Sequence, residues 1–418
     1  MGPGADRLGQ PRPAAIAAGP SDRRAANLLR EEPTFLRPGH HRNAPFTVPT
    51  DTDALRLAFN ELPLTPSQRE SLNRAAQKST THAHALQTLV EQTAGLSPAD
   101  TATVLGIVAE QPSGAAAACV RHLAQSDLWN QLAPEALSKL VAVMDAGDER
   151  GLRLLARLVE TKPEALTSKD AKGATLLSNL ALLATQPMSA PLYAKGLSRD
   201  RLVQDVLRDV TNPDHIEQGT APTCTVTSMQ FELARDNPAE YTRLLAGLCG
   251  PSGTSAMKGG GHLGLERSYI LPGRDDDRAV SEVLFQSAAM EFANGTDEFL
   301  GQRGTSVRDN GSQYKGLYPS QQRRLLENLF GVSYTTDTLD TPARMNAVLS
   351  RLKPYVAEGT NRPVLLEIDE GSFNHVVTYE RMRGNVITYR DPYGRLGTMT
   401  ESSFRLHVVT AHLPNSLR

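Results

Sequence analysis

Residues 218–234 read QGTAPTC followed by TVTSMQFELA, a loop with a glycine and a proline that runs into a predicted helix. Cys224 therefore stands at the predicted first turn of that helix. Free backbone N–H groups and partial positive charge at a helix N-terminus favour a thiolate over a thiol, and the thiolate is the nucleophile. Gln218 lies six positions upstream, where its amide can turn back toward the same sulfur. A sulfur nucleophile beside an amide donor is half of an acyl-transfer site.

The other half of such a site is predicted near the C-terminus. Three segments there read as β-strands, at residues 362–369, 374–379 and 386–389. His375 opens the second strand. A turn that contains Gly384 joins the second strand to the third, and Asp391 lies at the end of the third. Antiparallel pairing across this turn brings the two ends together, so we expect the imidazole and the carboxylate to be neighbours. They would serve as a base and the group that orients it.

In the order of these residues the chain resembles the papain-like cysteine peptidase superfamily. The shared features are Gln-Gly, a Cys six positions after that Gln at a helix start, a His that opens a strand and an Asp on the next strand. The resemblance covers residues from about 205 to 418, and it is greatest to bacterial effector and toxin members. Around the nucleophile the chain departs from papain, because residues 222–225 read PTCT where papain has CGSCW.

The resemblance implies a role for each residue of the predicted site. Cys224 would be the nucleophile and His375 the general base. Asp391 would take the orienting place, which is Asn in papain, and Gln218 would donate a hydrogen bond to the oxyanion. The implied fold packs the nucleophile helix on an antiparallel sheet, and no cofactor or metal is implied.

Upstream of this region the pattern is helical and weakly repetitive. A leucine followed by a small capping residue, often with a proline next, recurs at intervals of 31–36 residues. These starts are Leu64-Thr65-Pro66, Leu96-Ser97-Pro98, Leu132-Ala133-Pro134, Leu166-Thr167-Ser168 and Leu197-Ser198-Arg199. The period predicts stacked helical hairpins, with an ordinary helical bundle as the alternative.

We therefore predict an α+β protein in three parts. Residues 1–50 are rich in Pro, Gly, Ala and Arg and are predicted to be a disordered tail. Residues 51–205 would form the all-α repeat or bundle domain, and residues 206–418 the papain-like catalytic domain. Within the latter, the glycine-rich residues 250–264 are interpreted either as a lid over the cleft or as a disordered surface loop.

Three further helices are predicted in the C-terminal part, at residues 279–292, 320–330 and 341–352. The first is expected to be capped near Asp277. Gly331 is placed to end the second helix in a left-handed conformation.

Composition excludes several classes of function. The net charge of −2 provides no basic footprint for nucleic acid, and no apolar run approaches the length of a membrane span. The N-terminus lacks the apolar core of a signal peptide. The chain has three cysteines, which fits a reducing compartment, so we expect a protein of the cytoplasm or one delivered into a target cell's cytoplasm. No Cys and His spacing fits a zinc site.

These features predict a cysteine protease with a Cys224–His375–Asp391 triad that acts on a protein substrate, which the helical region helps to recruit. Two alternatives stay open. A deamidase or transglutaminase would use the same groups on a Gln side chain, because each reaction passes through an acyl-enzyme. A catalytically inactive scaffold would keep only the partner-binding role of the helical region.

Overall fold

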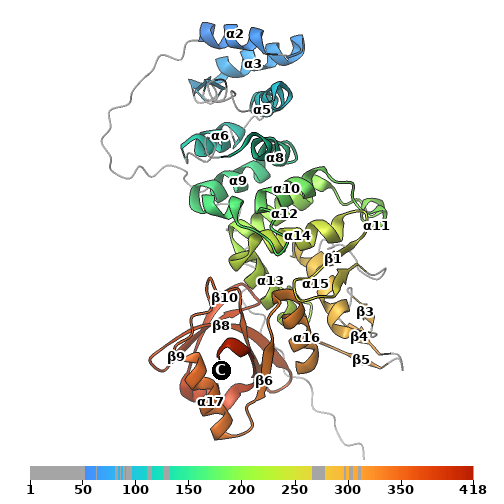
Figure 1. The fold of residues 1–418 in the computed structure, drawn as a ribbon, viewed down its shortest axis with the longest axis vertical. Helices are drawn as coiled ribbons and strands as arrows, with labels where there is room; N and C mark the ends of the chain where they lie inside the picture. The colour runs from blue at the N-terminus through green and yellow to red at the C-terminus, as the bar shows by residue number, and fades with distance from the viewer. Residues whose placement is uncertain are drawn as a thin grey trace, which may run out of the picture. The chain divides into compact units, whose positions relative to one another are not determined.

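The computed structural model describes residues 52–62, 64–80, 97–110, 115–125, 132–265, 278–295, 298–300, 305–308 and 312–417, together with five residues between 83 and 90. The tail predicted for residues 1–50 lies outside these described residues. Residues 50–418 pack as one compact unit. Its class is α+β, as predicted, with many helices followed by an antiparallel sheet (Figure 1).

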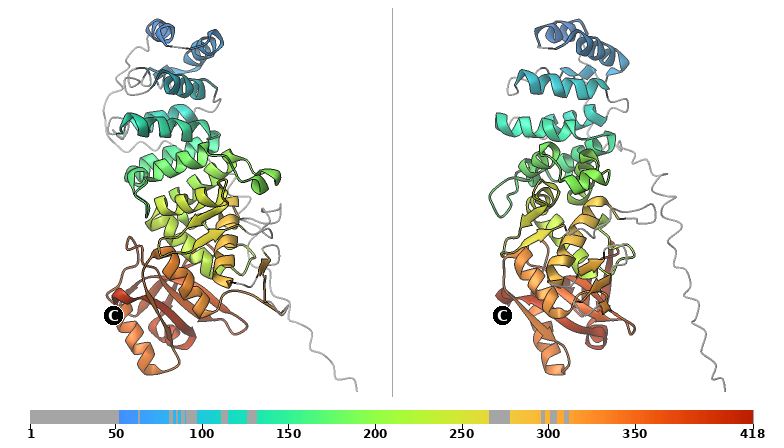
Figure 2. Two further views of the ribbon diagram at one scale, coloured as in Figure 1. Left: turned by 45° about the vertical axis from the view of Figure 1, so that its right-hand side comes forward. Right: turned by 90° about the vertical axis from the view of Figure 1, so that its right-hand side faces the viewer.

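The N-terminal helices stack in successive pairs (Figures 1 and 2). They are α2 (Thr52–Glu61), α3 (Pro66–Lys78), α5 (Pro98–Glu110), α6 (Ala115–Gln125), α8 (Pro134–Asp145), α9 (Glu149–Thr161), α10 (Leu176–Thr185) and α12 (Arg199–Thr211). Contacts run along the stack from α3 to α5, α8 and α10, and from α6 to α9 and α12. Each pair therefore covers the apolar face of the pair before it, as in repeat proteins.

Four of the five predicted helix starts coincide with helices. Helix α3 begins at Pro66, α5 at Pro98 and α8 at Pro134. Ser198 caps α12 by accepting a hydrogen bond from the backbone N–H of Arg201, at 3.2 Å. Local capping chemistry was thus sufficient to predict these starts.

The start predicted at Thr167 is wrong. Thr167 ends the short 3₁₀ helix η3 (Pro163–Thr167), and the next α-helix begins nine residues later, capped by Thr175. Between them the Asp170 carboxylate accepts hydrogen bonds from the backbone N–H groups of Lys172 and Ala174, at 2.7 and 3.0 Å. The side chain thus holds a turn instead of starting a helix, which is the competition typical of Asp.

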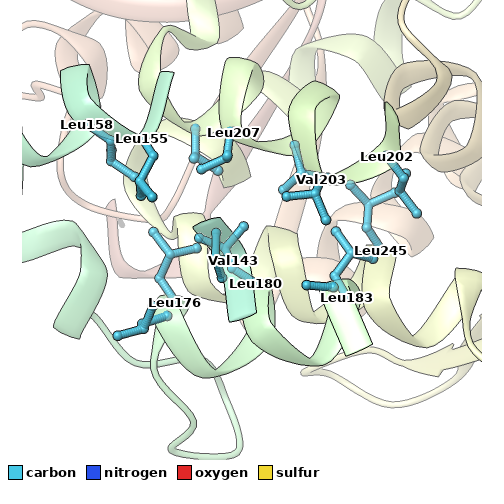
Figure 3. Close-up of a cluster of buried hydrophobic side chains, with 14 of the residues drawn as sticks. Val143, Leu155, Leu158, Leu176, Leu180, Leu183, Leu202, Val203, Leu207 and Leu245 are labelled. Atoms are coloured by element: carbon cyan, nitrogen blue, oxygen red, sulfur yellow. The ribbon is translucent and has the colours of Figure 1, made fainter. Parts of the chain in front are cut away.

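Leucine and valine side chains fill the space between the layers (Figure 3). Leu202 and Val203 of α12 lie close to Leu183 of α10 and Leu245 of α14 (Pro238–Cys249) in this cluster. Helix α12 contacts α9 and α10 on one side and α13 (Cys224–Asp236) and α15 (Val280–Asn294) on the other. The domain boundary predicted between residues 205 and 206 therefore falls inside α12, which packs on both the helical array and the C-terminal part.

The C-terminal part contains a six-stranded antiparallel sheet in the order β10-β9-β8-β7-β11-β6. The strands are β6 (Tyr334–Thr338), β7 (Val364–Asp369), β8 (Asn374–Arg383), β9 (Val386–Asp391), β10 (Arg395–Thr400) and β11 (Val408–Pro414). The three strands predicted from sequence are β7, β8 and β9. Strand β8 continues four residues beyond its predicted end, because its pairing with β9 persists to Arg383, which pairs with Val386.

Helices cover both faces of this sheet. Val376 of β8 and Leu365 of β7 join the core that contains Val226 and Met229 of α13. The opposite face packs Val377 and its neighbours against α17 (Pro342–Leu352) and α18 (Glu401–His407). Successive strand residues point to opposite faces, so the sheet separates two apolar cores.

The predicted helices at 279–292, 320–330 and 341–352 are confirmed as α15, α16 (Pro319–Phe330) and α17. Gly331 adopts the expected left-handed conformation, with φ of +66°. The cap of α15 differs from the prediction near Asp277, which lies outside the described residues. Its N-cap is Ala279, whose backbone N–H donates to the Glu282 carboxylate at 2.7 Å.

The glycine-rich segment is neither a lid nor a disordered loop. Strands β1 (Thr254–Ala256) and β2 (His262–Gly264) form a hairpin that packs on α14 and α15. A Cβ added at Gly259 would lie 2.2 Å from the carbonyl oxygen of Glu327, so close packing explains a glycine there. No residue of 250–264 lines the cleft described below.

The remaining elements are short. They are α11 (Ala190–Ala194), η4 (Pro213–His215), η5 (Asn415–Leu417), and the strands β3 (Glu298–Leu300), β4 (Thr305–Val307) and β5 (Gln313–Tyr314) of a small antiparallel sheet. Within the described part of the chain, no helix is long and apolar enough to cross a membrane.

Candidate active site

Cys224 is the first residue of α13 and is half-buried, as expected for a residue at a helix start. The loop before it is folded back on itself, because the N–H groups of Ala221 and Thr223 donate to the carbonyls of Gln218 and Ala221. The N–H of Gln218 donates to the carbonyl of Pro392 at 3.0 Å. This bond ties the loop before the nucleophile to the turn that follows Asp391.

A chain of buried hydrogen bonds anchors the start of α13. The Thr223 hydroxyl donates to Gln286 of α15 at 2.8 Å, and the Gln286 amide donates to Gln230 of α13 at 3.0 Å. Gln230 donates to the Tyr241 hydroxyl at 2.9 Å, which donates to Asp209 of α12 at 2.7 Å. Fully satisfied buried networks of this kind rigidify their surroundings. The position of the nucleophile is therefore connected to a helix of the stacked array.

The sheet brings His375 and Asp391 together, as predicted. Thr378 of β8 pairs with Arg390 of the antiparallel strand β9. The start of β8 and the end of β9 therefore lie at the same end of the sheet. The Nε2 atom of His375 lies 3.2 Å from a carboxylate oxygen of Asp391. The backbone N–H of Tyr393 donates to that same oxygen at 3.0 Å and holds the carboxylate in place.

The Cys224 sulfur lies near the His375 ring and interacts with it. Because Asp391 occupies Nε2, the ring nitrogen Nδ1 remains for the sulfur. Burial opposes the charged imidazole, but the hydrogen bonds and charges of Asp391 and Cys224 outweigh it and raise the pKa of His375 to about 10. Although burial opposes its charged form too, hydrogen bonds from His375 and Tyr393 lower the pKa of Asp391. The arrangement favours an imidazolium beside the Asp391 carboxylate.

Gln218 is the fourth predicted residue, and it lies beside the other three. Its side chain is buried and lies near the Tyr393 hydroxyl. Among the described residues its Oε1 atom has no hydrogen-bond partner. Gln218, Cys224 and His375 all line the same cleft, so the structure assembles the predicted set at one place.

Sequence reasoning missed Tyr393. Its ring stacks on His375 with centroids 5.6 Å apart and planes 17° from parallel. Tyr393 lies on the turn after Asp391, also near Gln218, and its own side chain is half-exposed. The only available signal was an aromatic residue directly after Asp391-Pro392, and a turn aromatic alone does not indicate which side chain it will cover.

The cleft has a volume of about 820 Å³ and extends from Cys224 across the sheet. Its floor includes Asn374 of β8, Glu367 of β7 and Thr410 of β11. Its far wall is the segment 314–319, which carries Tyr314 and Tyr318.

We expect iodoacetamide at pH 6 to label Cys224 in the folded protein before either other cysteine. Cys119 and Cys249 are 0% and 1% exposed, and burial raises the pKa of both thiols, to about 12 for Cys119. Cys224, by contrast, is only half-buried and lines the cleft, where the reagent can reach it. Peptide mapping by mass spectrometry identifies the labelled residue, and denatured protein provides the control in which all three react. Earlier labelling of Cys119 or Cys249 would contradict the assignment.

The Cys224→Ala substitution is expected to lower the pKa of His375 well below about 10. The hydrogen bond and the charge of the sulfur disappear, whereas burial, which acts against the charged ring, remains. The titration of ¹⁵N-labelled imidazole by NMR measures the change. His412 serves as the internal control, because burial lowers its pKa to about 4 and it bonds Gln322 and Thr336 away from the sulfur. An unchanged His375 titration would show that the sulfur does not interact with the ring.

Comparison of the chain with models of protein families, with curated proteins and with solved structures finds no match.

Proposed function

We propose that this protein is a papain-like cysteine hydrolase that cleaves peptide bonds in protein substrates, with Cys224 as the nucleophile. The observation that carries the proposal is that His375 bonds Asp391 through Nε2 at 3.2 Å while the Cys224 sulfur lies near enough to the same ring to raise its pKa. A thiol, a base and an orienting carboxylate in this order are the groups that acyl transfer requires. The packing of α13 on β8 also supports a papain-like arrangement.

In the proposed mechanism the Cys224 thiolate attacks the carbonyl carbon of the scissile peptide bond and forms a carbon–sulfur bond. His375 transfers its Nδ1 proton to the departing amine as the carbon–nitrogen bond breaks. The neutral ring then takes a proton from water, whose oxygen attacks the thioester and releases the acid. Asp391 keeps the ring oriented through Nε2 in both steps.

The developing oxyanion needs hydrogen-bond donors. The Cys224 backbone N–H is free of an intrahelical partner because Cys224 is the first residue of α13. The Gln218 amide group can supply the second donor, since one of its two N–H groups is enough for Tyr393. Loss of one such donor typically costs about 100- to 1,000-fold in rate.

The stacked helices would contribute binding energy for a protein substrate. Stacked pairs present an extended surface. Contacts remote from the reacting bond position a substrate and thereby raise the rate. The helical region holds none of the four proposed catalytic residues, so its proposed role is recruitment.

A peptide library tests the proposed reaction against its closest alternatives. The library is prepared from a cell extract by cleavage after glutamate, incubated with the full chain, and analysed by mass spectrometry. Hydrolysis yields two fragments from one peptide. Deamidation leaves the peptide intact with a small gain in mass, and transamidation adds the mass of an amine. Intact, modified peptides without fragments would overturn the protease assignment and support the Gln-directed alternatives.

Asp391→Asn is expected to retain more activity than Asp391→Ala. The Asn oxygen can still accept a hydrogen bond from the protonated ring at Nε2, whereas Ala leaves the ring free to turn. We expect Ala to cost on the order of 10⁴-fold in rate, the size of loss seen for orienting carboxylates. The kcat/KM on one cleaved library peptide measures both variants. Full activity in Asp391→Ala would show that another group holds His375.

A further inference from the structure

We propose that Glu367 recognises a cationic side chain, lysine or arginine, in the polypeptide bound along the cleft. The inference rests on the proposed function, because it names the substrate class of the same site. It draws on the position of the Glu367 carboxylate, the occupancy of its two oxygens, and the side chains that surround it.

Glu367 lies on the cleft floor close to the proposed catalytic residues. It is on β7, where it pairs with Val376 of β8, and the adjacent Ile368 pairs with His375. It points to the same face of the sheet as Leu365, toward the core beneath α13. The residue is 6% exposed and lines the cleft.

Only one of its carboxylate oxygens is occupied. Oε1 accepts a hydrogen bond from the Asn374 amide at 2.9 Å. Among the described residues, no hydrogen bond or ion pair involves Oε2, and that atom is not among the buried polar atoms that lack a partner. Oε2 therefore faces the open cleft, and Asn374 holds the carboxylate in one orientation.

No cation of the described chain neutralises Glu367. Lys315 lines the far wall but makes no ion pair with it within 4.0 Å. A buried carboxylate without a positive partner is costly, and a bound cation offsets that cost. An acidic side chain in the same place would be repelled, so the charge provides selectivity as well as affinity.

The surroundings suit a long basic side chain. Thr410, which pairs with Glu367, and Gln322 offer polar groups beside the carboxylate. Tyr314 and Tyr318 also line the cleft, and the Arg308 guanidinium lies over both rings, at 4.7 and 5.7 Å from their centroids. The ring surface that Arg308 leaves uncovered can pack against the alkyl stem of lysine or arginine while the charged end reaches the carboxylate.

The first test measures cleavage selectivity with the same peptide library. Wild-type protein is expected to cleave peptides enriched in Lys or Arg at one position near the cut. For a cleaved peptide, the ratio of kcat/KM with arginine to kcat/KM with uncharged citrulline should fall about 10- to 100-fold in Glu367→Gln. Glu370→Gln is the matched control, because Glu370 is an exposed carboxylate on the nearby β7–β8 turn and does not line the cleft.

The second test measures binding without turnover. Nα-acetyl-arginine amide is titrated into ¹⁵N-labelled protein, and the side-chain amide signals of Asn374 report on its neighbour Glu367. We expect shifts in wild type and Glu370→Gln, with affinity reduced at least tenfold in Glu367→Gln and for the citrulline compound. A thermal unfolding curve for each variant checks that it is folded.

The outcomes separate the two proposals. Cleavage without basic enrichment, or with a ratio that Glu367→Gln leaves unchanged, overturns the role of Glu367 and leaves the hydrolase standing. Arginine-dependent shifts that require Glu367, with no cleavage of the library, support the cation site and overturn the hydrolase. No shift at Asn374 together with no basic enrichment overturns the cation site.

Discussion

We expect Cys224→Ala to reduce peptide cleavage by about 10⁴- to 10⁶-fold, the loss seen when the nucleophile of a catalytic triad is removed. Without the sulfur no acyl-enzyme forms, and the remaining oxyanion donors and substrate contacts supply only the residual rate. The substitution removes one small atom from a half-buried position at the first turn of α13, so the fold should persist. Cleavage of one library peptide, followed by chromatography, measures the rate.

Two other cysteines provide matched controls for this variant. Cys119→Ala and Cys249→Ala remove the same atom from buried positions away from the cleft. Each leaves a small internal cavity, which lowers stability modestly, and each should retain cleavage at or near the wild-type rate. His375→Ala should lose activity to an extent similar to Cys224→Ala, since residues that act as a unit are not additive. Retained cleavage in Cys224→Ala would refute the assigned nucleophile.

The second large effect concerns stability. Arg208→Met is expected to lower the free energy of unfolding by about 3–5 kcal/mol, the cost of breaking a buried ion pair by removing one partner. The Arg208 guanidinium bonds both Asp209 and Glu282 at 2.6 Å, and those carboxylates are 0% and 1% exposed. Methionine fills similar space but leaves two buried carboxylates without their cation. Urea unfolding followed by circular dichroism measures the loss.

An exposed arginine provides the comparison for this variant. Arg153 pairs with Glu149 one turn away on α9, with side chains 53% and 41% exposed. Arg153→Met should therefore change stability by no more than about 0.5 kcal/mol. Equal effects of the two substitutions would show that the buried cluster between α12 and α15 contributes no more than a surface pair.

The Arg208 cluster also bears on the active site. Asp209 accepts from the Tyr241 hydroxyl, which begins the chain of hydrogen bonds that ends at Thr223, directly before Cys224. Val280, at the start of α15, donates its N–H to Asp205 of α12 at 2.9 Å. A fragment that begins at residue 206 would lose Asp205 and the first half of α12. For that reason the recruitment role of the helices is better tested by surface substitutions than by truncation.

Much of the site was predictable from short stretches of sequence. The position of Cys224 follows from a loop that runs into an apolar helical pattern, and the proximity of His375 and Asp391 follows from one hairpin. Both inferences depend on local geometry, because helix starts and antiparallel turns are encoded within about ten residues. The prediction for Gln218 also depends on the loop turning back toward Cys224, and this loop spans only six positions.

Other features were not predictable because they depend on residues distant in sequence. Glu367 reads as an ordinary polar residue in a strand, and only the sheet order and the 314–319 wall make it the floor of a cleft. The glycines of 250–264 read as flexible, yet Gly259 is required by the close approach of α16. Thr167 was mispredicted for a local reason: it reads as a helix cap, but the Asp170 side chain three residues later holds a turn instead.

The sequence by itself determined the α+β class, the limits of most helices, and the approach of His375 to Asp391, since propensity, caps and turns act over a few residues. Only the tertiary structure brings the loop before Cys224 to the end of the sheet that carries His375 and Asp391. The hydrogen bond from the Gln218 N–H to the Pro392 carbonyl joins the two. The tertiary structure also decided that Tyr393 covers the imidazole and that α12 belongs to both parts of the chain. The physical reason is that these contacts join separate elements of the fold, and packing selects them only once the sheet and helices have formed.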